Sequence, residues 1–541
     1  MTPSALIAPR PAHPGAEPGR PKDIGWSEFL TALQDLIRAS CCGAGMGGAT
    51  AARRKADLPG FARLGYEAWR RTVRPTSPVI PVIAGRIVLP GVTVVEPELA
   101  PRPRVDVVIV NGRIDRIVPA GSQAIEGARV IETLRGHFVA PALADLHIHN
   151  PPSNIFNLTP LFLLLYLRQG IVRLREAGDV DGTGTPAALA LIESGAFPGL
   201  DLHYSYAFVT TDPARWPNAL RFDRVEQAES IIEQLRHLGA RWVKSYENLD
   251  APRVRALVEA AGRAGLGVMG HVPAKLAFEE ALLPDTQHYF GVPSPRDLRR
   301  DHIVNRIVDW QGVTPARIAE IVEVCLRNGL AMTPTLSSGS NMLRLQDYEA
   351  ERQAADVRIL PDFYPDIIWH PVHGLPIFRN ISAEDFRQGR DAAKRKLELT
   401  HALWSAGVPL RLGTDVQQPF AVPGIALHQE LAAFARAGIP WALAWKFASL
   451  DAARAVGVED SGAIRAGMRA DLLTSDASPL EPGWSTQRMS AVLARGHLTL
   501  AKDLDAAIEG QRARFTGAIS RLTSRWLAQF ALARFAKRAV P

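Results

Sequence analysis

The chain has 541 residues, of which 47% are hydrophobic and 22% are charged, so a wholly disordered chain is excluded. This length predicts one large domain with additions, or several small domains. The formal net charge is +7, but residues 511–541 hold seven basic residues and no acidic one, so the rest of the chain is neutral overall. We therefore expect no nucleic-acid partner.

Cysteine usage and hydropathy indicate the compartment. The three cysteines, Cys41, Cys42 and Cys325, are too few for a disulfide framework, which is typical of a reducing environment. No cationic segment followed by an apolar core is visible near the start, and the apolar run Leu161–Leu167 is far shorter than the ~20 residues that span a bilayer. We expect a soluble, cytoplasmic protein.

Residues 1–78 are predicted to form an N-terminal extension. Six prolines among the first 22 residues favour disorder at its start. Apolar residues from Trp26 to Ile37 recur at helical spacing and predict a short amphipathic helix. The Gly- and Ala-rich residues 43–52 indicate a linker.

A small β-domain is predicted to begin at residue 79 and to end at residue 140. Its clearest signal is a β-hairpin, in which Val105–Val110 and Arg113–Val118 flank the turn residues Asn111 and Gly112.

Residues 141–458 alternate short apolar runs with amphipathic stretches such as 225–238, 253–264 and 315–328. The predicted strands are Leu143–Ile148, Ile171–Leu174, Ser205–Val209, Trp242–Ser245, Gly267–Gly270, Thr286–Tyr289, Ala331–Leu336 and Leu410–Gly413. Eight strands that alternate with helices predict an α/β fold, a parallel (β/α)8 TIM barrel. The segment 337–390 is too long for a simple connection, so we interpret it as an insertion near the active site.

Two histidines at the end of the first predicted barrel strand are the first candidate metal ligands. His147 and His149 are separated by one residue, so a strand directs both side chains to the same face. Paired imidazoles are good metal ligands. Taken alone, this pair is also compatible with a purely structural role.

Four more residues that could bind a metal or transfer a proton lie at the carboxyl ends of later predicted strands. A TIM barrel places its catalytic groups at these strand ends. The four residues are Lys244, His271, His288 and Asp415. Singly, each has an ordinary alternative: a solvated lysine, a hydrogen-bonded histidine or, for the aspartate, a helix N-cap. Together with the histidine pair they form an ordered series of six, which chance does not explain well.

Three motifs resemble those of the amidohydrolase superfamily, and within it the imidazolonepropionase-like amidases and dipeptidases. Residues 141–149 (PALADLHIH) resemble the PGxxDxHxH opening, and residues 170–179 (GIVRLREAGD) resemble the GxTTVRDxG second strand. Residues 462–473 (GAIRAGMRADLL) are similar to the GxIxxGxxADLV strand that returns to the β-domain. The resemblance runs from about residue 84 to residue 498, with departures at Ala142, Glu176 and Ser449.

The resemblance implies a discontinuous β-sandwich, formed by residues 79–140 and 459–505, that flanks the barrel. It also implies a binuclear centre in which two divalent ions share six ligands: His147, His149, Lys244, His271, His288 and Asp415. Lys244, carboxylated by carbon dioxide to a carbamate, would bridge the two ions. The first ion would be held by His147, His149 and Asp415, and the second by His271 and His288. Zn²⁺ suits these ligands best, and Mn²⁺ or Co²⁺ could substitute.

The resemblance also assigns roles in catalysis. Asp415 would take a proton from the attacking hydroxide and deliver it to the departing amine. Tyr246, two residues after Lys244, is a candidate for binding the oxyanion or the substrate, with a solvent-facing tyrosine as the alternative. Mononuclear deaminases of the superfamily lack the bridging lysine and carry a glutamate where this chain has Ala274. The sequence therefore favours hydrolysis over deamination.

Two further regions carry weaker predictions. His370 and His373 lie in the insertion and are candidate substrate-binding residues, with solvation as the alternative. The basic segment 506–541 is predicted to be an amphipathic helix whose apolar face carries Phe515, Ile519, Leu522, Trp526 and Phe530. We expect this helix to dock on its own domain or on a neighbouring subunit. Weak contact with an anionic membrane is the alternative.

The function that these residues predict is metal-dependent hydrolysis of an amide-type C–N bond in a small molecule: an N-acyl amino acid, a dipeptide, an aryl amide or a carbamate. Hydrolysis of a cyclic amide or a lactone by the same centre is the alternative activity. A barrel that serves as a scaffold through its amphipathic ends is the non-enzyme alternative. We expect a homo-oligomer, because dimers are common.

Overall fold

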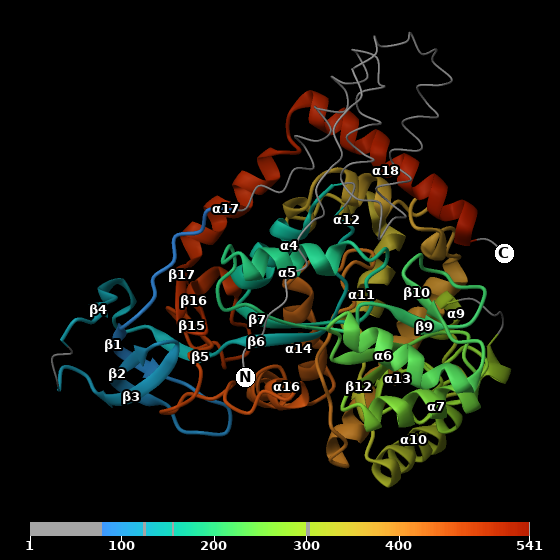
Figure 1. Ribbon diagram of the computed structural model, residues 1–541, viewed down its shortest axis with the longest axis horizontal. Helices are drawn as coiled ribbons and strands as arrows, with labels where there is room; N and C mark the ends of the chain where they lie inside the picture. The colour runs from blue at the N-terminus through green and yellow to red at the C-terminus, as the bar shows by residue number, and fades with distance from the viewer. Residues whose placement is uncertain (1–77, 123–125, 154–155, 299–302, 540–541) are drawn as a thin grey trace, which may run out of the picture. The chain divides into compact units, whose positions relative to one another are not determined.

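The computed structural model describes residues 78–539 except 123–125, 154–155 and 299–302 (Figure 1). The chain divides into two compact units, Met1–Arg71 and Thr72–Pro541, and the described residues all belong to the second. The predictions for the N-terminal extension, including its helix, its linker and the two adjacent cysteines, lie outside the described residues.

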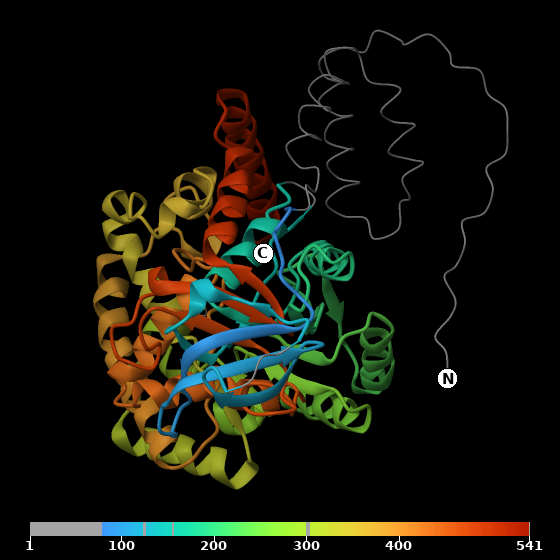
Figure 2. The same cartoon turned by 90° about the vertical axis from the view of Figure 1, so that its left-hand side faces the viewer.

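The first sheet is mixed and is built from two distant parts of the chain. Its strands are β1 (Ile87–Val94), β2 (Arg102–Val110), β3 (Arg113–Pro119), β4 (Arg129–Val130), β5 (Phe138–Pro141), β15 (Leu472–Ser475), β16 (Met489–Ala494) and β17 (His497–Leu500). Their order is β17-β16-β15-β5-β1-β2-β3, with β4 paired to β1. Figure 2 shows the blue strands of the first part beside the red strands of the second. Apolar side chains from both parts meet in one buried cluster, which includes Ile87, Val107, Leu472 and Leu493.

The hairpin predicted around Asn111 and Gly112 is confirmed. Strands β2 and β3 are antiparallel, and Val110 pairs with Arg113 across the turn. Asn111 and Gly112 have φ angles of 50° and 79°. A two-residue hairpin loop of this left-handed type matches the natural twist of the strands, which explains why Asn-Gly is a reliable signal.

Parallel strands between residues 143 and 333 form two further sheets. One has the order β6 (Leu143–Ile148), β7 (Ile171–Glu176), β8 (Asp201–Tyr204). The other has the order β10 (Ala219–Arg221), β9 (Phe208–Thr210), β11 (Trp242–Ser245), β12 (Gly267–Gly270), β13 (Asp285–Gln287), β14 (Ala331–Thr333). Strand β6 follows β5 almost directly, so the mixed sheet and the parallel strands share a continuous stretch of chain.

Residues 410–416 lie between the two parallel sheets. The backbone N–H of Leu146 donates to the carbonyl of Leu412 at 3.0 Å, and Met332 forms an isolated bridge with Leu410. The predicted strand Leu410–Gly413 is therefore present as isolated bridges rather than as a regular strand. These bridges connect β14 on one side with β6 on the other.

The predicted strand Ser205–Val209 is also different in the structure, because β8 ends at Tyr204 and β9 begins at Phe208. Tyr206 has a φ angle of 66°, and its N–H donates to the Glu176 carboxylate at 3.0 Å instead of to a neighbouring strand. A left-handed residue and a diverted hydrogen bond interrupt the strand at this point.

Helices connect the parallel strands and form the segments around them. They are α4 (Thr159–Arg168), α5 (Gly184–Glu193), α6 (Ala228–His237), α7 (Ala251–Arg263), α8 (Phe278–Ala281), α9 (Ile303–Val308), α10 (Pro315–Asn328), α11 (Leu336–Leu343), α12 (Tyr348–Glu351), α13 (Ala383–Ser405), α14 (Ile425–Arg436), α15 (Trp441–Phe447), α16 (Leu450–Ala455), α17 (Ala501–Ala513) and α18 (Ala518–Ala539). Short turns are η1 (Glu132–Leu134), η2 (Val225–Gln227), η3 (Pro295–Asp297), η4 (Arg344–Asp347), η5 (Val357–Ile359), η6 (Tyr364–Ile368), η7 (Pro376–Phe378) and η8 (Thr486–Arg488). Among the described residues, no helix is both long and apolar enough to cross a membrane.

Helix α10 shows why some bounds are visible in the sequence. The Thr314 hydroxyl accepts a hydrogen bond from the Arg317 N–H at 3.2 Å, and Gly329 ends the helix with a φ angle of 60°. A threonine N-cap and a left-handed glycine C-cap satisfy backbone groups that a helix leaves unpaired at its ends. The predicted bounds of this helix match those observed.

The C-terminal segment 506–541 forms parts of two helices, which corrects the prediction of one. Helix α17 begins at Ala501, inside the range assigned to the second part of the β-domain, and packs against α4 and β16. Helix α18 packs on η6 and η7, and Figure 1 shows it in red above the α12 region.

The predicted apolar face of α18 is not the face that docks. Ile519 and Leu522 are 76% and 73% exposed, Trp526 is exposed, and Phe515 is buried but precedes the helix. Among residues 518–533 of the helix, the buried side chains are Ser524, Leu527, Ala528 and Leu532. Both stripes have helical spacing, so spacing alone does not tell which of them is buried.

A buried carboxylate in β13 forms ion pairs with an arginine of β7 and with an arginine of the segment 410–416. Asp285, in β13, is fully buried and lies 2.6 Å from Arg175 of β7 and 2.7 Å from Arg411. Burial by itself raises the pKa of Asp285, but the two guanidinium groups outweigh burial and lower the pKa to about 2. The ion pairs therefore stabilise the folded state above about pH 4, and this contribution is lost as the pH falls toward about 2.

Replacing Asp285 by asparagine leaves Arg175 buried without its counterion. We expect Asp285→Asn to lower the free energy of unfolding by about 3–5 kcal/mol. Urea unfolding followed by circular dichroism measures this change. The matched control is Glu233→Gln, because Glu233 pairs with Arg236 at 3.1 Å on the surface. We expect that control to cost less than about 1 kcal/mol. Equal unfolding midpoints for wild type and Asp285→Asn would contradict the assigned role.

Candidate metal centre

The structure brings the predicted metal ligands together from five separate stretches of chain. His147 lies in β6, with His149 just beyond it, and Lys244 lies in β11. His271 and His288 directly follow β12 and β13. The ring centroids of His147 and His288 are 4.7 Å apart, and those of His271 and His288 are 4.8 Å apart. These distances place the four imidazoles around one small volume.

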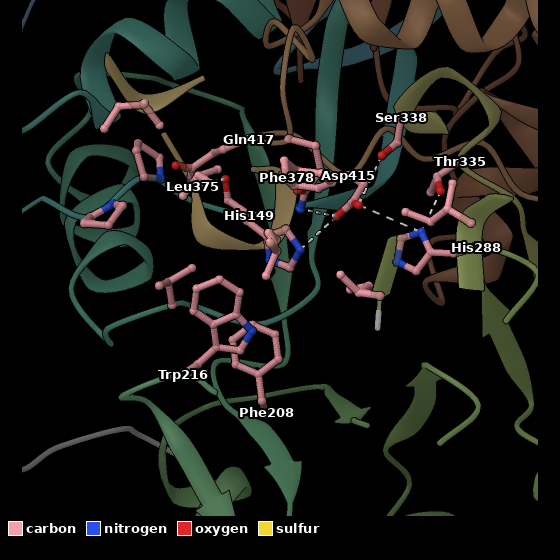
Figure 3. Close-up of a pocket in the computed structure, with 18 of the residues that line it drawn as sticks. His149, Phe208, Trp216, His288, Thr335, Ser338, Leu375, Phe378, Asp415 and Gln417 are labelled. Atoms are coloured by element: carbon pink, nitrogen blue, oxygen red, sulfur yellow. Dashed lines mark hydrogen bonds and ion pairs between the residues drawn. The ribbon is translucent and has the colours of Figure 1, made fainter. Parts of the chain in front are cut away.

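Asp415 lies at the centre of this group, as Figure 3 shows. Its Oδ1 is 3.4 Å from Nε2 of His147 and 3.2 Å from Nε2 of His149. Its Oδ2 is 3.9 Å from Nδ1 of His288. The ligand atoms of His147, His149 and Asp415 all lie within 4.8 Å of one another, which is a suitable arrangement for a single cation.

Several ring nitrogens in this group are buried without a hydrogen-bond partner. Both nitrogens of His147 and Nδ1 of His271 make no well-formed hydrogen bond within the described part of the chain, although Nε2 of His147 lies 3.4 Å from Asp415 and Nδ1 of His271 lies 3.6 Å from Glu247. Burial, and after it the charge of Lys244, lowers the pKa of these two histidines well below the ordinary value. A neutral imidazole offers a lone pair to a metal ion. Unpartnered lone pairs in a buried group are costly, so the donor set fits a divalent cation.

The other two histidines are oriented by neighbouring groups. His149 donates from Nδ1 to the Gly178 carbonyl at 2.7 Å, which leaves its Nε2 directed at Asp415. Nδ1 of His288 lies 2.6 Å from the Thr335 hydroxyl. Hydrogen bonds of this kind fix the ring orientation of metal-binding histidines.

Lys244 is fully buried beside the histidines. Its charge contributes to the lowered pKa of His147, His271 and His288. Its Nζ donates a hydrogen bond to Oε1 of Gln287. Burial lowers the pKa of Lys244 to about 7, because the charged ammonium loses its hydration. The neutral amine, which is the nucleophilic form, is therefore accessible near neutral pH.

The backbone around the ligands is closely packed and locally strained. Asp145 accepts hydrogen bonds from the Thr414 hydroxyl at 2.6 Å and from the His147 N–H at 3.2 Å, so one carboxylate ties β6 to residues 410–416. A Cβ atom at Gly413 would lie 2.5 Å from Cβ of His147. His288 and Asp415 have φ angles of 62° and 58°. Left-handed backbone at residues other than glycine is concentrated at functional sites.

Tyr246 is buried at the edge of the group. Its hydroxyl oxygen accepts a hydrogen bond from Trp216 Nε1 at 2.8 Å, and its ring centroid is 4.6 Å from that of His271. Because Trp216 donates to this oxygen, Tyr246 can still donate its own O–H. The structure places this residue at the cavity described next.

A cavity of about 270 Å³ opens above the metal-ligand group. The candidate metal ligands His149, His271, His288 and Asp415 form its polar end, together with Tyr246. The remaining walls are mostly apolar and come from distant elements, which include Trp216, Phe290, Phe363 and Phe378. Figure 3 shows Phe208 and Trp216 on one side of His149 and the insertion residues Leu375 and Phe378 on another. Leu532 of α18 also lines the cavity, so the C-terminal helix forms part of the wall.

The two candidate substrate-binding histidines of the insertion do not line this cavity. The rings of His370 and His373 stack on each other with centroids 4.9 Å apart. Nδ1 of His370 accepts a hydrogen bond from the Val372 N–H at 3.1 Å, and His373 is exposed. The structure therefore gives these two residues a local role in the insertion.

Some cavity residues carry no signal in the sequence. Ser338 donates to Oδ2 of Asp415 at 3.3 Å, and Thr335 contacts His288, but neither belongs to a motif. Lys396 lines the cavity from α13, where it is one of several basic residues in the sequence AAKRKLE. Only the fold distinguishes these side chains from their surface neighbours.

Comparison with solved structures shows a common fold. The bottromycin amidohydrolase structure is 20% identical, with a TM-score of 0.60 over 88% of this chain and 96% of that one. A Xaa-Pro dipeptidase with bound methionine in the active site is 16% identical, with a TM-score of 0.57 over 77% of this chain and 100% of that one. Ochratoxinase from A. niger is 17% identical, with a TM-score of 0.54 over 77% and 95%. These likenesses indicate an α/β fold of the TIM-barrel type.

Comparison of the sequence itself identifies the family. No curated protein matches the chain. The profile described as the amidohydrolase family matches residues 138–499. This range includes every candidate metal ligand and the strands β5, β15 and β16 of the mixed sheet. The chain therefore belongs to the amidohydrolase family.

Proposed function

We propose that this amidohydrolase cleaves an amide-type C–N bond in a small molecule by metal-dependent hydrolysis. The observation that carries the proposal is the convergence of six candidate metal ligands, of which five are buried and His149 is partly buried. Four of the six line the polar end of an apolar cavity. Solved neighbours of the same fold include a bottromycin amidohydrolase and a Xaa-Pro dipeptidase. N-acyl amino acids, dipeptides, aryl amides and carbamates are the substrate classes that this chemistry covers.

The scaffold that we infer is a closed (β/α)8 barrel with a two-part β-sandwich beside it. The isolated bridges of residues 410–416 with β14 and β6 support this inference, because they give this segment the position of an eighth strand. The ligands then lie at the carboxyl ends of the strands, where TIM-barrel enzymes carry their active sites.

The ligand set fits two divalent ions, for which Zn²⁺ is our first choice. His147, His149 and Asp415 would hold one ion, and His271 and His288 the other. Lys244 would bridge them as a carbamate, formed when its neutral amine adds to carbon dioxide and releases a proton. Divalent ions, when bound here, polarise a carbonyl group and lower the pKa of water.

The chain's own residues supply the proton transfers. The Asp415 carboxylate accepts a proton from the water that adds to the carbonyl carbon, and it delivers this proton to the nitrogen as the C–N bond breaks. Ser338 donates to Oδ2 of Asp415 and holds the carboxylate in place. The Tyr246 O–H would donate to the carbonyl oxygen as negative charge develops on it.

Deamination is the less suitable reaction for this site. Lys244 is buried among the histidines, and Ala274 occupies the position where related deaminases carry a glutamate. An alanine cannot transfer a proton, so the site lacks that acid–base group.

Loss of the proton-transfer group tests the proposed mechanism. We expect Asp415→Asn to lower kcat by about 10²–10⁴-fold, because the amide cannot take up and release the proton. Lys244→Ala removes the inferred bridge and is expected to lower kcat at least as much. Asp476→Asn, at an exposed ion pair with Arg488, is the control that leaves kcat unchanged. Full activity of either site variant in metal-replete protein would contradict the mechanism.

A substrate panel tests the bond that is cleaved. We expect turnover of N-acyl amino acids or dipeptides and no turnover of lactams or lactones, measured by chromatographic detection of the hydrolysed product of each compound. Turnover of the cyclic compounds alone would favour the cyclic amide or lactone hydrolase. No turnover of any compound by metal-replete protein would favour the scaffold.

The C-terminal helix offers a test of the cavity wall. Leu532 is buried and lines the cavity, whereas Ile519 on the same helix is exposed. We expect Leu532→Trp to lower kcat/KM for a substrate with a large apolar acyl group by at least about tenfold, because the larger ring occupies substrate space. Ile519→Trp is the matched control and should leave kcat/KM unchanged. Equal effects of the two variants would contradict a role of α18 in the substrate cavity.

A further inference from the structure

Lys396 is a buried cation in the wall of the cavity. It lies on α13, is only 8% exposed, and borders both the main cavity and a smaller neighbouring one. No carboxylate of the described residues lies within ion-pair distance of its nitrogen, and its side chain makes no hydrogen bond to them. Its one described polar interaction is with the face of the Trp310 ring, 5.3 Å from the centroid.

The Lys396 ammonium lies beside α11, the helix that also contacts Asp415. A Cβ atom at Gly339 would be 3.7 Å from Nζ of Lys396, so the absence of a side chain at Gly339 leaves the ammonium room. Ser338, the preceding residue, donates to Asp415 at 3.3 Å. Two adjacent residues of α11 therefore connect the ammonium with the carboxylate that we assign to proton transfer.

An ammonium buried without a counterion is costly, because it has lost its hydration and gained no ion pair. Burial accordingly lowers the pKa of the Lys396 ammonium to about 8. The neighbouring walls do not compensate, because they are mostly apolar, and a cation–π contact replaces only part of the lost hydration. A bound anion from the substrate would supply the missing partner.

We propose that Lys396 binds a carboxylate of the substrate, on the side of the departing amine. Asp415 delivers its proton to the amine nitrogen, and Lys396 lines the same cavity next to α11, the helix that contacts Asp415. An amino acid carries its carboxylate two bonds from that nitrogen. The substrates are then N-acyl amino acids or dipeptides with an apolar acyl part, rather than neutral aryl amides or carbamates. This inference rests on the proposed function.

The test uses N-benzoyl derivatives of glycine, leucine, proline and phenylalanine, each as the free acid and as the carboxamide. We expect the wild type to hydrolyse the best free acid with a kcat/KM about 10–100-fold above that of its carboxamide, because a charge-assisted contact is lost with the carboxylate. Lys396→Met should raise KM for the free acid by a similar factor. KM for the carboxamide, and kcat for both the free acid and the carboxamide, should stay within about threefold of the wild-type values.

Two further variants separate recognition from folding. Lys396→Arg keeps the positive charge and should retain a preference for the free acid. Arg395→Met is the matched control, because Arg395 is the adjacent cation on α13 and pairs with Glu398 at 2.6 Å on the surface. It should leave the preference unchanged. Thermal unfolding of each variant shows whether the fold is intact.

The outcomes distinguish this inference from the proposed function. Equal losses for free acid and carboxamide in Lys396→Met would overturn carboxylate binding and leave amide hydrolysis intact. Equal turnover of the two forms by the wild type would do the same. If the wild type opened only lactams or lactones, both the proposed function and this inference would be wrong.

Discussion

The burial of unpartnered imidazole nitrogens is the constraint on which this structure depends. His147 is fully buried with neither ring nitrogen hydrogen-bonded, and His271 leaves Nδ1 in the same state. Each unsatisfied buried polar atom costs about 1–3 kcal/mol. A fold that keeps such groups together needs a partner for their lone pairs, and a divalent cation is the partner that suits neutral imidazole and carboxylate ligands.

The surrounding structure holds these ligands in place through other buried carboxylates. Asp145 links the strand of His147 to the segment of Asp415, and Asp285 forms ion pairs with both Arg175 of β7 and Arg411. Glu430 accepts the N–H groups of Leu336 and Ser337 at 2.9 and 2.6 Å, which positions the start of α11. Helix α11 carries Ser338, so this third carboxylate supports Asp415 from the opposite side. The polar interior of the protein therefore serves mainly to position the site.

The sequence predicts well those features that local physics determines. The Asn-Gly turn sets the β2–β3 hairpin, the caps of α10 set its bounds, and the alternation of His147 and His149 indicates a shared face. Candidate ligands at successive strand ends also converge as expected, because parallel strands end at the same edge of a sheet.

Features that depend on tertiary packing could not be predicted in this way. The break between β8 and β9 arises from a hydrogen bond between Tyr206 and Glu176, which lie 30 residues apart. The predicted stripe of α18 is the more apolar one in the sequence, yet the buried stripe is the one that packs against η6 and η7. Lys396 differs from its basic neighbours solely because α13 turns it toward the cavity.

The metal content of the purified protein tests the central claim most directly. Protein produced with zinc and bicarbonate is analysed by plasma mass spectrometry, with Lys244→Ala as the comparison. The account predicts about two ions per wild-type chain, as a two-metal site requires, and fewer in the variant. One ion in both proteins would contradict a bridging role for Lys244. No ion after reconstitution would contradict the metal centre itself.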